Sequence, residues 1–293
     1  MDVPQHGTFQ LASLDDRLGP ASGRFFGSGY RRAEHLVSWD GIGAGGQTRA
    51  TASVRYPTDW SRKGGSELRP HLSTVDVLLL GAEAAQMRLL RDGLDADSAW
   101  LRRVEIQAGP RAVEDDLAGF EVSADAPTVT GAEIQVPVQV ANMRLRLHFT
   151  VLAQPSPTLW QDFREHRQHV RDIHVDRHAL AATATAGLER DRHVTMIDAF
   201  VVALQLGQIL LYELDAVDRR TTNTLWMRTT VLEAAAPAPV LTGPVTTSAS
   251  LEDARVVAMR GGSWRTATIS GEFFGVHTSC AVTHELPAER GTE

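Results

Sequence analysis

Two histidines stand just before two apolar stretches that resemble each other. Aligned without a gap, the stretches read HLSTVDVLLLGAEAAQ, which begins at His71, and HVTMIDAFVVALQLGQ, which begins at His193. Three polar positions match: His71 with His193, Asp76 with Asp198, and Gln86 with Gln208. Histidine titrates near neutral pH and can serve as a general acid or base. We therefore take His71 and His193 as candidate catalytic residues, and the repeat as a sign of two related halves.

Each histidine is followed by a predicted helix start. Ser73-Thr-Val-Asp76 and Thr195-Met-Ile-Asp198 fit the pattern of an N-cap residue with a carboxylate three residues later. A carboxylate there complements the helix dipole and contributes roughly 0.3–1 kcal/mol, which explains both aspartates without catalysis. The alternative is that Asp76 or Asp198 orients a histidine or acts as a base, so both stay candidate catalytic residues.

The helices that follow are predicted to be buried. Residues 74–92 and 196–214 are apolar nearly all round, which is typical of a helix enclosed by the rest of a protein. Gly81 and Gly207 are poor helix formers and are tolerated where another backbone or a ligand approaches closely.

Five further polar residues are candidates for substrate binding. Gln86 and Gln208 lie ten residues beyond their aspartates, about 15 Å along a helix, so they would not act on the same atom. They would tie the helix to a strand or to the other half, or contact a substrate. Glu83 would face a groove between the halves or reach solvent. Arg32 and Arg167 belong to similar short segments and would present a guanidinium to a phosphopantetheine or sugar phosphate.

Strand-like runs surround the predicted helices. A pair with a Gly-rich turn at 41–46 is expected within 31–57. Further runs are expected at 100–108, 117–123, 132–140 and 143–153, and after the second helix near 224–233, 253–260, 264–274 and 276–285. Residues 1–16 are expected to be a polar lead-in, 58–70 a loop, and 234–250 a Pro-containing connection.

This order predicts an α+β fold of the double hot-dog kind. It has two antiparallel sheets, each wrapped round a buried central helix and joined edge to edge so that no edge is left to aggregate. The halves would be residues 1–154, with a Gly-rich loop near their start, and 155–293. The loop, residues 18–30, carries three aromatic residues but lacks the Lys-Ser/Thr of a phosphate-binding P-loop.

The composition of the chain disfavours several classes of function. The chain has 293 residues and a net charge of −7, which disfavours nucleic-acid binding. Cys280 is the only cysteine, so no intramolecular disulfide or cysteine-based metal cluster forms, and a reducing cytoplasm is expected. The N-terminus does not resemble a signal peptide, and the apolar run 199–211 is too short to span a bilayer. The His-rich segment 166–178 has the alternation of a strand rather than zinc-site spacing, and no cofactor or metal is expected.

The segment LGPASGRFFGSGYRRAEH, residues 18–35, together with the two H-x4-D helices, resembles the avirulence D (AvrD) family over most of the chain. That family is linked to syringolides, and it is similar to double hot-dog proteins of the A-factor synthase type. The resemblance implies a cytoplasmic acyltransferase of secondary metabolism. The enzyme would move a β-ketoacyl group from an acyl carrier protein or CoA thioester to a hydroxyl of a small sugar or triose phosphate, giving butenolide-type products. A homodimer is possible, and the resemblance assigns no catalytic residue.

Two other functions stay open. The first is a hot-dog dehydratase of β-hydroxyacyl thioesters, in which His71 and Asp198 would share one site. The missing H-x3-G-x4-P signature weighs against it. The second is a non-enzymatic protein that binds a small lactone. It would need a partner, because no DNA-binding helix-turn-helix is evident in the sequence.

Overall fold

The protein is represented by a computed structural model. It describes residues 7–42, 46–63, 66–153, 163–219, 222, 224–237, 239–259 and 261–287. The boundary expected between the halves, after residue 154, lies outside the described residues.

Two central helices organise the molecule, and both begin where the sequence predicts. Helix α2 spans Thr74–Arg91 and helix α3 spans Met196–Leu214. The predicted capping boxes are present. The backbone N–H of Asp76 donates to Ser73 Oγ at 3.2 Å, and that of Asp198 to Thr195 Oγ1 at 3.1 Å. Each aspartate accepts a hydrogen bond in return from the backbone N–H of its N-cap residue. These bonds satisfy N–H groups that a helix start otherwise leaves unpaired.

The described strands repeat the same order around each helix. In the first half they are β2 (Glu34–Ile42), β3 (Thr48–Arg55), β6 (Ala99–Gln107), β7 (Phe120–Ala124), β9 (Glu133–Val140) and β10 (Met143–Val151). In the second half they are β11 (Gln168–Asp176), β12 (Ala181–Leu188), β14 (Trp226–Ala234), β16 (Val245–Met259), β17 (Gly262–Phe273) and β18 (Val276–Glu285). Short strand β8 (Thr128–Thr130) pairs with β9. The expected runs 132–140 and 143–153 correspond to β9 and β10, which pair as a hairpin that turns at residues 141–142.

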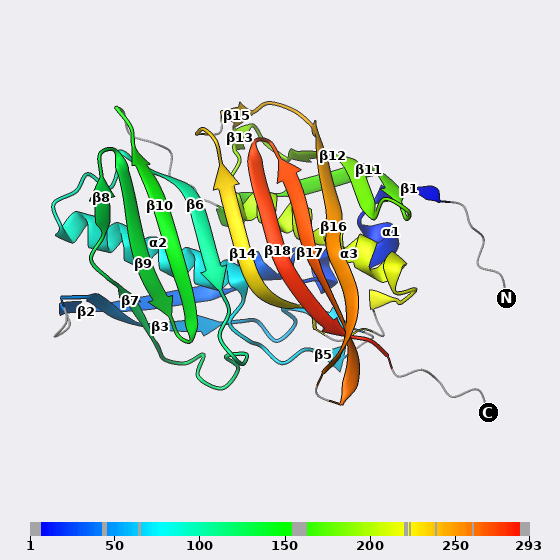
Figure 1. The fold of residues 1–293 in the computed structure, drawn as a ribbon, viewed down its shortest axis with the longest axis horizontal. Helices are drawn as coiled ribbons and strands as arrows, with labels where there is room; N and C mark the ends of the chain where they lie inside the picture. Colours follow the sequence, from blue (N-terminus) through cyan, green and yellow to red (C-terminus); the bar gives the residue numbers. More distant parts are fainter. Residues whose placement is uncertain are drawn as a thin grey trace.

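The two halves join edge to edge, as expected, and the strands that we assigned to two sheets thereby form one continuous sheet. Its strand order is β1-β11-β12-β16-β17-β18-β14-β6-β10-β9-β7-β3-β2, with β8 beside β9. The join is the antiparallel pair β6–β14, where Leu232 lies opposite Val104. Backbone hydrogen bonds therefore cross from half to half, and neither half leaves its inner edge open. Figure 1 shows the central strands of this sheet, from β9 to β17, in front of both helices.

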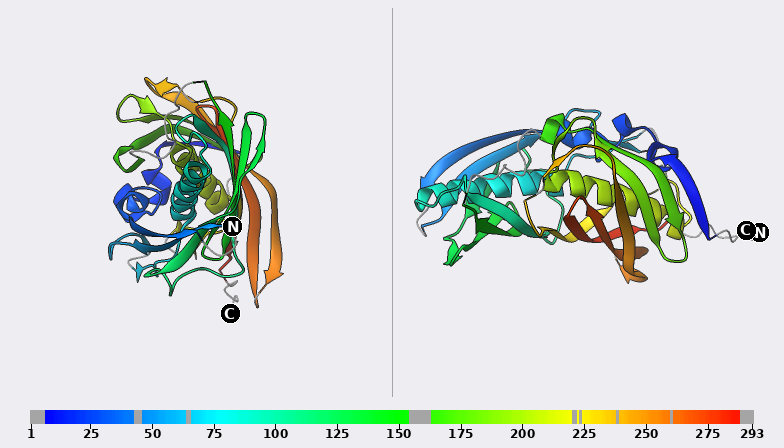
Figure 2. Two further views of the ribbon diagram at one scale, coloured as in Figure 1. Left: turned by 90° about the vertical axis from the view of Figure 1, so that its left-hand side faces the viewer. Right: turned by 90° about the horizontal axis from the view of Figure 1, so that it is seen from above.

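The sheet curves round the helices, as the end-on view of Figure 2 shows. The second view of Figure 2 shows α2 and α3 following one another along the long axis. The helix glycines are the points of close approach. A Cβ on Gly81 would lie 2.5 Å from Leu145 of β10, and one on Gly207 would lie 2.5 Å from Ile269 of β17. Helix α3 is long and apolar enough to cross a membrane by length and composition, but it is 83% buried as a core helix.

Three segments differ from the sequence-based expectation. The expected polar lead-in contains β1 (Thr8–Ser13) and the short helix α1 (Asp15–Leu18), and β1 pairs with β11 of the second half. The expected connection 234–250 holds β15 (Val240–Leu241) and the first residues of the long strand β16. The run VTTSAS consists mostly of small and hydroxylated residues, so its sequence did not predict a strand. It nevertheless forms part of β16, which packs against α3. The expected loop 58–70 holds the small hairpin β4 (Arg62–Lys63) and β5 (Ser66–Glu67).

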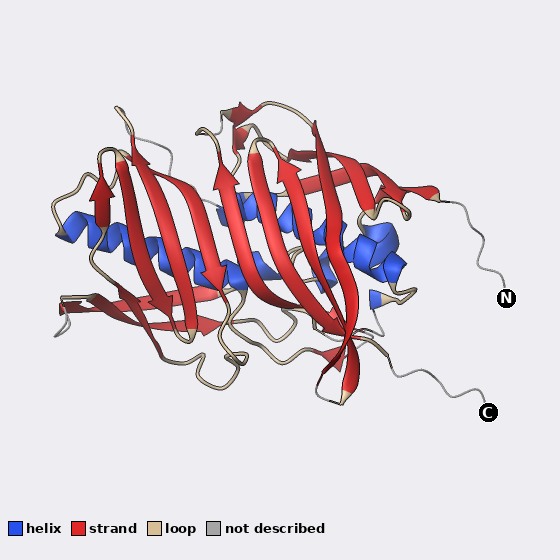
Figure 3. Cartoon of the chain, viewed as in Figure 1, coloured by secondary structure: helices blue, strands red, loops and turns tan. Residues whose placement is uncertain are grey.

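The Gly-rich loop is structured and packs between the halves. It contains the single turns η1 (Ala21–Gly23) and η2 (Gly29–Arg32). The ring of Phe26 lies edge-on to Phe200 of α3 at 5.8 Å, and Tyr30 stacks on Phe163 at 6.2 Å. Phe163 belongs to the turn η3 (Phe163–Glu165). The loop thus connects the start of the chain to the second half. Figure 3 shows the helices in blue and the sheet in red, with tan loops joining them.

Candidate functional site

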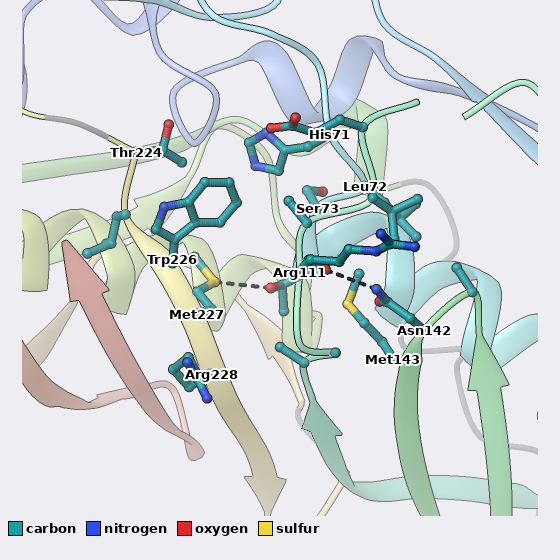
Figure 4. Close-up of a pocket in the computed structure, with 18 of the residues that line it drawn as sticks. His71, Leu72, Ser73, Arg111, Asn142, Met143, Thr224, Trp226, Met227 and Arg228 are labelled. Atoms are coloured by element: carbon teal, nitrogen blue, oxygen red, sulfur yellow. Dashed lines mark hydrogen bonds between the residues drawn. The ribbon is translucent and has the colours of Figure 1, made fainter. Parts of the chain in front are cut away.

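A cavity of about 880 Å³ opens at the start of α2, beside the β6–β14 join. Its wall combines the segment before α2, the loop 108–116, the start of β14 and part of the Gly-rich loop. The volume falls in the range that holds a small organic ligand. Figure 4 shows Trp226 and Met227 below His71 on one side, with Asn142 and Met143 on the other. The residues named in the following paragraphs as lining the cavity are part of this wall.

His71 lines the cavity between two tryptophans. Its ring centroid lies 5.5 Å from that of Trp60 and 5.3 Å from that of Trp226. Its Nδ1 lies 3.4 Å from the carbonyl oxygen of Arg69. A carbonyl only accepts, so this contact requires the proton on Nδ1, and in the neutral ring Nε2 is then the unprotonated acceptor. Burial lowers the pKa of His71 below its ordinary 6.5, which favours the same neutral form. Such an imidazole can take a proton from a ligand.

The first turn of α2 contributes to the same wall. Ser73 and Thr74 both line the cavity. Thr74 Oγ1 donates to Met227 Sδ at 3.1 Å, which ties the helix to β14. The first backbone N–H groups of a helix have no acceptor inside the helix and carry its positive dipole end. A developing negative charge beside them would be stabilised.

Asp76 is fully buried and is held by side chains that the sequence did not connect to it. His35 Nε2 donates to Asp76 Oδ1 at 2.7 Å, and the Tyr56 hydroxyl donates to Asp76 Oδ2. Arg164 Nη2 donates to His35 Nδ1 at 2.8 Å, so Nδ1 carries no proton. Burial by itself would raise the pKa of Asp76, but the hydrogen bonds from His35, Ser73 and Tyr56 hold that pKa below its usual value.

Asp198 is also fully buried and has an equivalent set of partners. His166 Nδ1 donates to Asp198 Oδ2 at 2.7 Å, and Gln168 Nε2 donates to Oδ1 at 2.5 Å. The Tyr30 hydroxyl in turn lies 3.0 Å from Gln168 Oε1. Neither aspartate lines the cavity, and Asp198 is not brought next to His71. Both carboxylates fasten a helix start to a preceding segment.

The other predicted site residues are dispersed. His193 is exposed on β13 (Arg192–His193), which pairs with β15, and it lies outside the cavity wall. Glu83 and Gln86 are half-buried on α2, also outside that wall. Arg32 forms an ion pair with Asp59.

Two predicted substrate-binding residues have contrasting positions. Arg167 is exposed, and its Nη1 donates to the carbonyl oxygens of Arg164 and His166. Gln208, from the middle of α3, lines the same cavity as His71. The structure therefore brings together His71 and Gln208 from the predicted set.

Four arginines line the cavity, and none of them was predicted from the sequence. They are Arg24, Arg111, Arg219 and Arg228. Arg24 lies in the Gly-rich loop, where a charged residue stands directly before two phenylalanines. This position among aromatic residues was the only feature of the local sequence that could have pointed to a role for Arg24. The other three come from loops and a strand start whose neighbours are set by the tertiary fold.

The His-rich segment belongs to several unrelated contacts. His166 holds Asp198, while His174 Nε2 lies 2.9 Å from Gln10 Nε2 of the neighbouring strand β1. Among the described residues, no group of three or more His, Cys, Asp or Glu side chains is placed to hold a metal ion.

Comparison with known proteins assigns the family. A family model described as Pseudomonas avirulence D protein (AvrD) matches residues 9–159 and 150–287, nearly the whole chain. The chain belongs to the AvrD family. Because the two matched segments cover one half each, the AvrD match agrees with the duplicated strand order. No curated protein matches.

Several solved structures are similar to this AvrD chain at low identity. One is a conserved protein of unknown function with a hot dog fold from Alicyclobacillus acidocaldarius (11% identity, 86% of this chain and 97% of that chain, TM-score 0.46). Another is the acyl-CoA thioesterase II TesB2 from Mycobacterium marinum (9% identity, 86% and 98%, TM-score 0.44). A third is the dehydratase domain of RzxB from Pseudomonas fluorescens (12% identity, 82% and 93%, TM-score 0.39).

Proposed function

We propose that this AvrD-family protein is an acyltransferase of secondary metabolism. It moves a β-ketoacyl group from a carrier-protein or CoA thioester to a hydroxyl of a small sugar or triose phosphate, and the ester closes to a butenolide- or syringolide-type product. The observation that carries the proposal is the position of His71. A neutral imidazole lines a ligand-sized cavity three residues before the first turn of a buried helix.

The reaction needs a general base and a group that stabilises an oxyanion, and the cavity wall offers both. The acceptor hydroxyl attacks the thioester carbonyl carbon while His71 Nε2 takes its proton. The resulting oxyanion lies against the first-turn N–H groups of α2. When the intermediate collapses, the C–S bond breaks, the ester C–O bond remains, and the imidazolium returns its proton to the thiolate. No other reactant is required.

The same cavity also offers surfaces for both substrates. Trp226, Met227 and Phe26 provide apolar wall for an acyl chain. Gln208, Arg111 and Arg228 provide hydrogen-bond donors for a polar acceptor or for the pantetheine arm. Burial of a charged general base is avoided, since His71 rests in the neutral form.

The test is to incubate the protein with a β-ketoacyl thioester, with and without dihydroxyacetone phosphate or a ketose, and to analyse the products by mass spectrometry. We expect an ester that requires both substrates. Free acid in equal amounts with or without acceptor would instead identify a thioesterase. Turnover of a β-hydroxyacyl thioester to the enoyl product would identify a dehydratase. Tight lactone binding without any turnover would identify a binding protein.

A further inference from the structure

The proposed general base, His71, lies in residues 68–73, which belong to no helix or strand. We propose that Tyr56 is the positioning residue for His71, because its hydroxyl fixes the backbone of His71 to the buried start of α2. Tyr56 directly follows β3 and is not part of the cavity wall, so it acts on the reaction only through His71. The inference rests on the proposed function in taking His71 as the proton acceptor.

The imidazole of His71 is held only loosely by its own hydrogen bond. Its Nδ1 lies 3.4 Å from the carbonyl oxygen of Arg69, which is longer than a typical N–H···O bond. The direction of the ring therefore depends on its packing and on how the backbone of His71 is fixed. A general base must reach within hydrogen-bond distance of the proton that it takes, so this direction affects the rate.

Tyr56 supplies a contact to the backbone of His71. Its hydroxyl donates to the carbonyl oxygen of His71 at 2.9 Å and also to Asp76 Oδ2. A tyrosine hydroxyl has one proton, so these two acceptors share it. Burial and the neighbouring charge of Asp76 raise the pKa of Tyr56 well above its ordinary value, so the hydroxyl keeps this proton at neutral pH. The backbone of His71 is thereby joined to a carboxylate at the helix start.

The carboxylate that holds Tyr56 is itself firmly fixed. Asp76 has no exposed surface, and it accepts further hydrogen bonds from the backbone of Ser73 and from His35. Arg164 of the second half donates to His35 in turn. A fully hydrogen-bonded buried network of this kind is rigid, so the Tyr56 hydroxyl has a defined place relative to α2.

The ring of Tyr56 also supports His71 through Trp60. The ring centroids of Tyr56 and Trp60 are 4.9 Å apart, and Trp60 lies edge-on to the imidazole of His71 at 5.5 Å. Trp60 is 2% exposed, and its Nε1 donates at 2.9 Å to the carbonyl oxygen of Leu68, three residues before His71. Tyr56 therefore supports both the backbone and the ring of His71.

The second half of the molecule contains a matched control, Tyr30. This residue has no exposed surface, and its hydroxyl donates to Gln168 Oε1 at 3.0 Å, while Gln168 donates to Asp198 at the start of α3. In the described part of the chain, the hydrogen bonds and ring contacts of Tyr30 do not include His71. Tyr56→Phe and Tyr30→Phe thus each remove one hydroxyl from the network of a capping aspartate, but only the first touches His71.

The first measurement needs no turnover. The His71 ring is titrated by NMR in the parent protein and in both variants, and its signal is the one that disappears in His71→Gln. In Tyr56→Phe, release of the backbone lets water reach the imidazole, and Asp76 loses a donor that offsets its charge. Both effects should raise the pKa of His71 toward its ordinary 6.5. Asp76 and Glu114, the charged groups that act on His71, are kept in both variants, and Tyr30→Phe should titrate like the parent.

Turnover gives the second measurement. Tyr56→Phe should lower kcat roughly tenfold or more, as expected for a misplaced base, and should change KM little because the cavity wall is intact. Tyr30→Phe should keep both constants. Urea unfolding should give similar midpoints for the two variants, since each loses one buried hydroxyl. A difference in kcat between them would then not follow from a difference in stability.

The proposal would be overturned if His71 titrated alike in Tyr56→Phe and Tyr30→Phe. It would equally be overturned if the two variants of an active parent had the same kcat. Either result could occur in a protein that transfers acyl groups. Conversely, a parent that forms no ester would contradict the proposed function, while a shift of the His71 titration confined to Tyr56→Phe would still support the positioning role. The two tests therefore fail independently.

Discussion

The histidines differ in what their ring nitrogens contact. This difference distinguishes a histidine that could take part in catalysis from histidines that stabilise the fold. His35 and His166 each donate to a buried carboxylate at 2.7 Å, one to Asp76 and the other to Asp198. His71 has a carbonyl on one nitrogen and the cavity beside it. An imidazole fixed to a buried carboxylate holds two segments together, whereas one that faces a cavity can exchange protons with a ligand.

The proton-accepting role of His71 predicts a specific pH profile. Because burial lowers its pKa below 6.5, the imidazole is neutral above that value and becomes protonated only in more acidic solution. The rate kcat/KM should therefore be flat from about pH 7 upward and fall below pH 6.5 with one ionisation. Steady-state kinetics between pH 5 and 8 would measure this limb. A rate that rises as the solution becomes acidic would contradict a neutral base.

Asp76 predicts a stability change in the acid range. Its pKa in the folded protein lies below the ordinary 3.8, so the unfolded chain binds a proton more readily. Its contribution is present above that ordinary value and is lost as pH falls through the lower, folded value. Asp76→Asn should cost about 3 kcal/mol near pH 7, since it leaves partners of a buried carboxylate unpaired, and less in acid. Urea unfolding at pH 7 and pH 3 would show a shrinking difference. A constant difference would contradict the assignment.

At the scale of elements, the sequence predicted both helices because their signals are local. A capping residue, a carboxylate three positions later and an apolar run all lie within one segment, and no distant partner is needed to interpret them. The partners of Asp76 and Asp198 could not be predicted in the same way. His35 and Tyr56 are brought to Asp76 by the pairing of β2 with β3, and Arg164 comes from the other half. The arginines of the cavity and the strand pairing of residues 8–13 were not predicted for the same reason, because they too depend on tertiary contacts.

The contribution of each helix cap to stability should be measurable and similar in the two halves. Ser73→Ala and Thr195→Ala each remove one acceptor for a first-turn N–H, so each should destabilise the protein by about 1 kcal/mol. Thermal or urea unfolding would measure both. Ser73→Ala should also alter turnover, because Ser73 lines the cavity, while Thr195→Ala should not. Equal effects on turnover would argue against an active site at α2 alone.

The two helix glycines should tolerate alanine poorly. An added Cβ would lie 2.5 Å from Leu145 at Gly81 and 2.5 Å from Ile269 at Gly207. Overpacking of this kind costs about 1–3 kcal/mol, despite the higher helix propensity of alanine. Gly243→Ala is the control, because its added Cβ would meet no atom within 4 Å. Urea unfolding should separate the two helix variants from this control. Stabilisation at Gly81 or Gly207 would contradict the packing.

At the scale of the whole molecule, the halves are joined by more than the β6–β14 pair. Arg164 of the second half donates to His35 of the first, and Arg31 of the first donates to the carbonyl oxygen of His166 at 2.9 Å. Strand β1, from the start of the chain, closes the far edge of the second half. The duplicated order of strands and helix and the edge-to-edge join were predicted from the sequence repeat. The identity of the joining strands, β6 and β14, was not predicted, because it depends on tertiary pairing that the sequence does not reveal.

This continuity predicts that the chain unfolds as one unit. Circular dichroism and tryptophan fluorescence should report the same urea midpoint, because tryptophans near the join and helices in both halves lose structure together. Separate expression of residues 1–154 and 155–293 should give insoluble products, since each would expose β6 or β14 as an unpaired edge. Two well-separated transitions would contradict a shared core.

Ester formation by three proteins tests the central claim most directly. The parent protein, His71→Gln and His193→Gln would each be supplied with a β-ketoacyl thioester and dihydroxyacetone phosphate, and ester would be quantified by mass spectrometry. His193 is the matched control, because it holds the equivalent position in the repeat but lies exposed outside the cavity. We predict that His71→Gln loses at least about a hundredfold in rate, as expected for removal of a general base, while His193→Gln retains the parent rate. Full activity in His71→Gln, with loss in His193→Gln, would contradict the account.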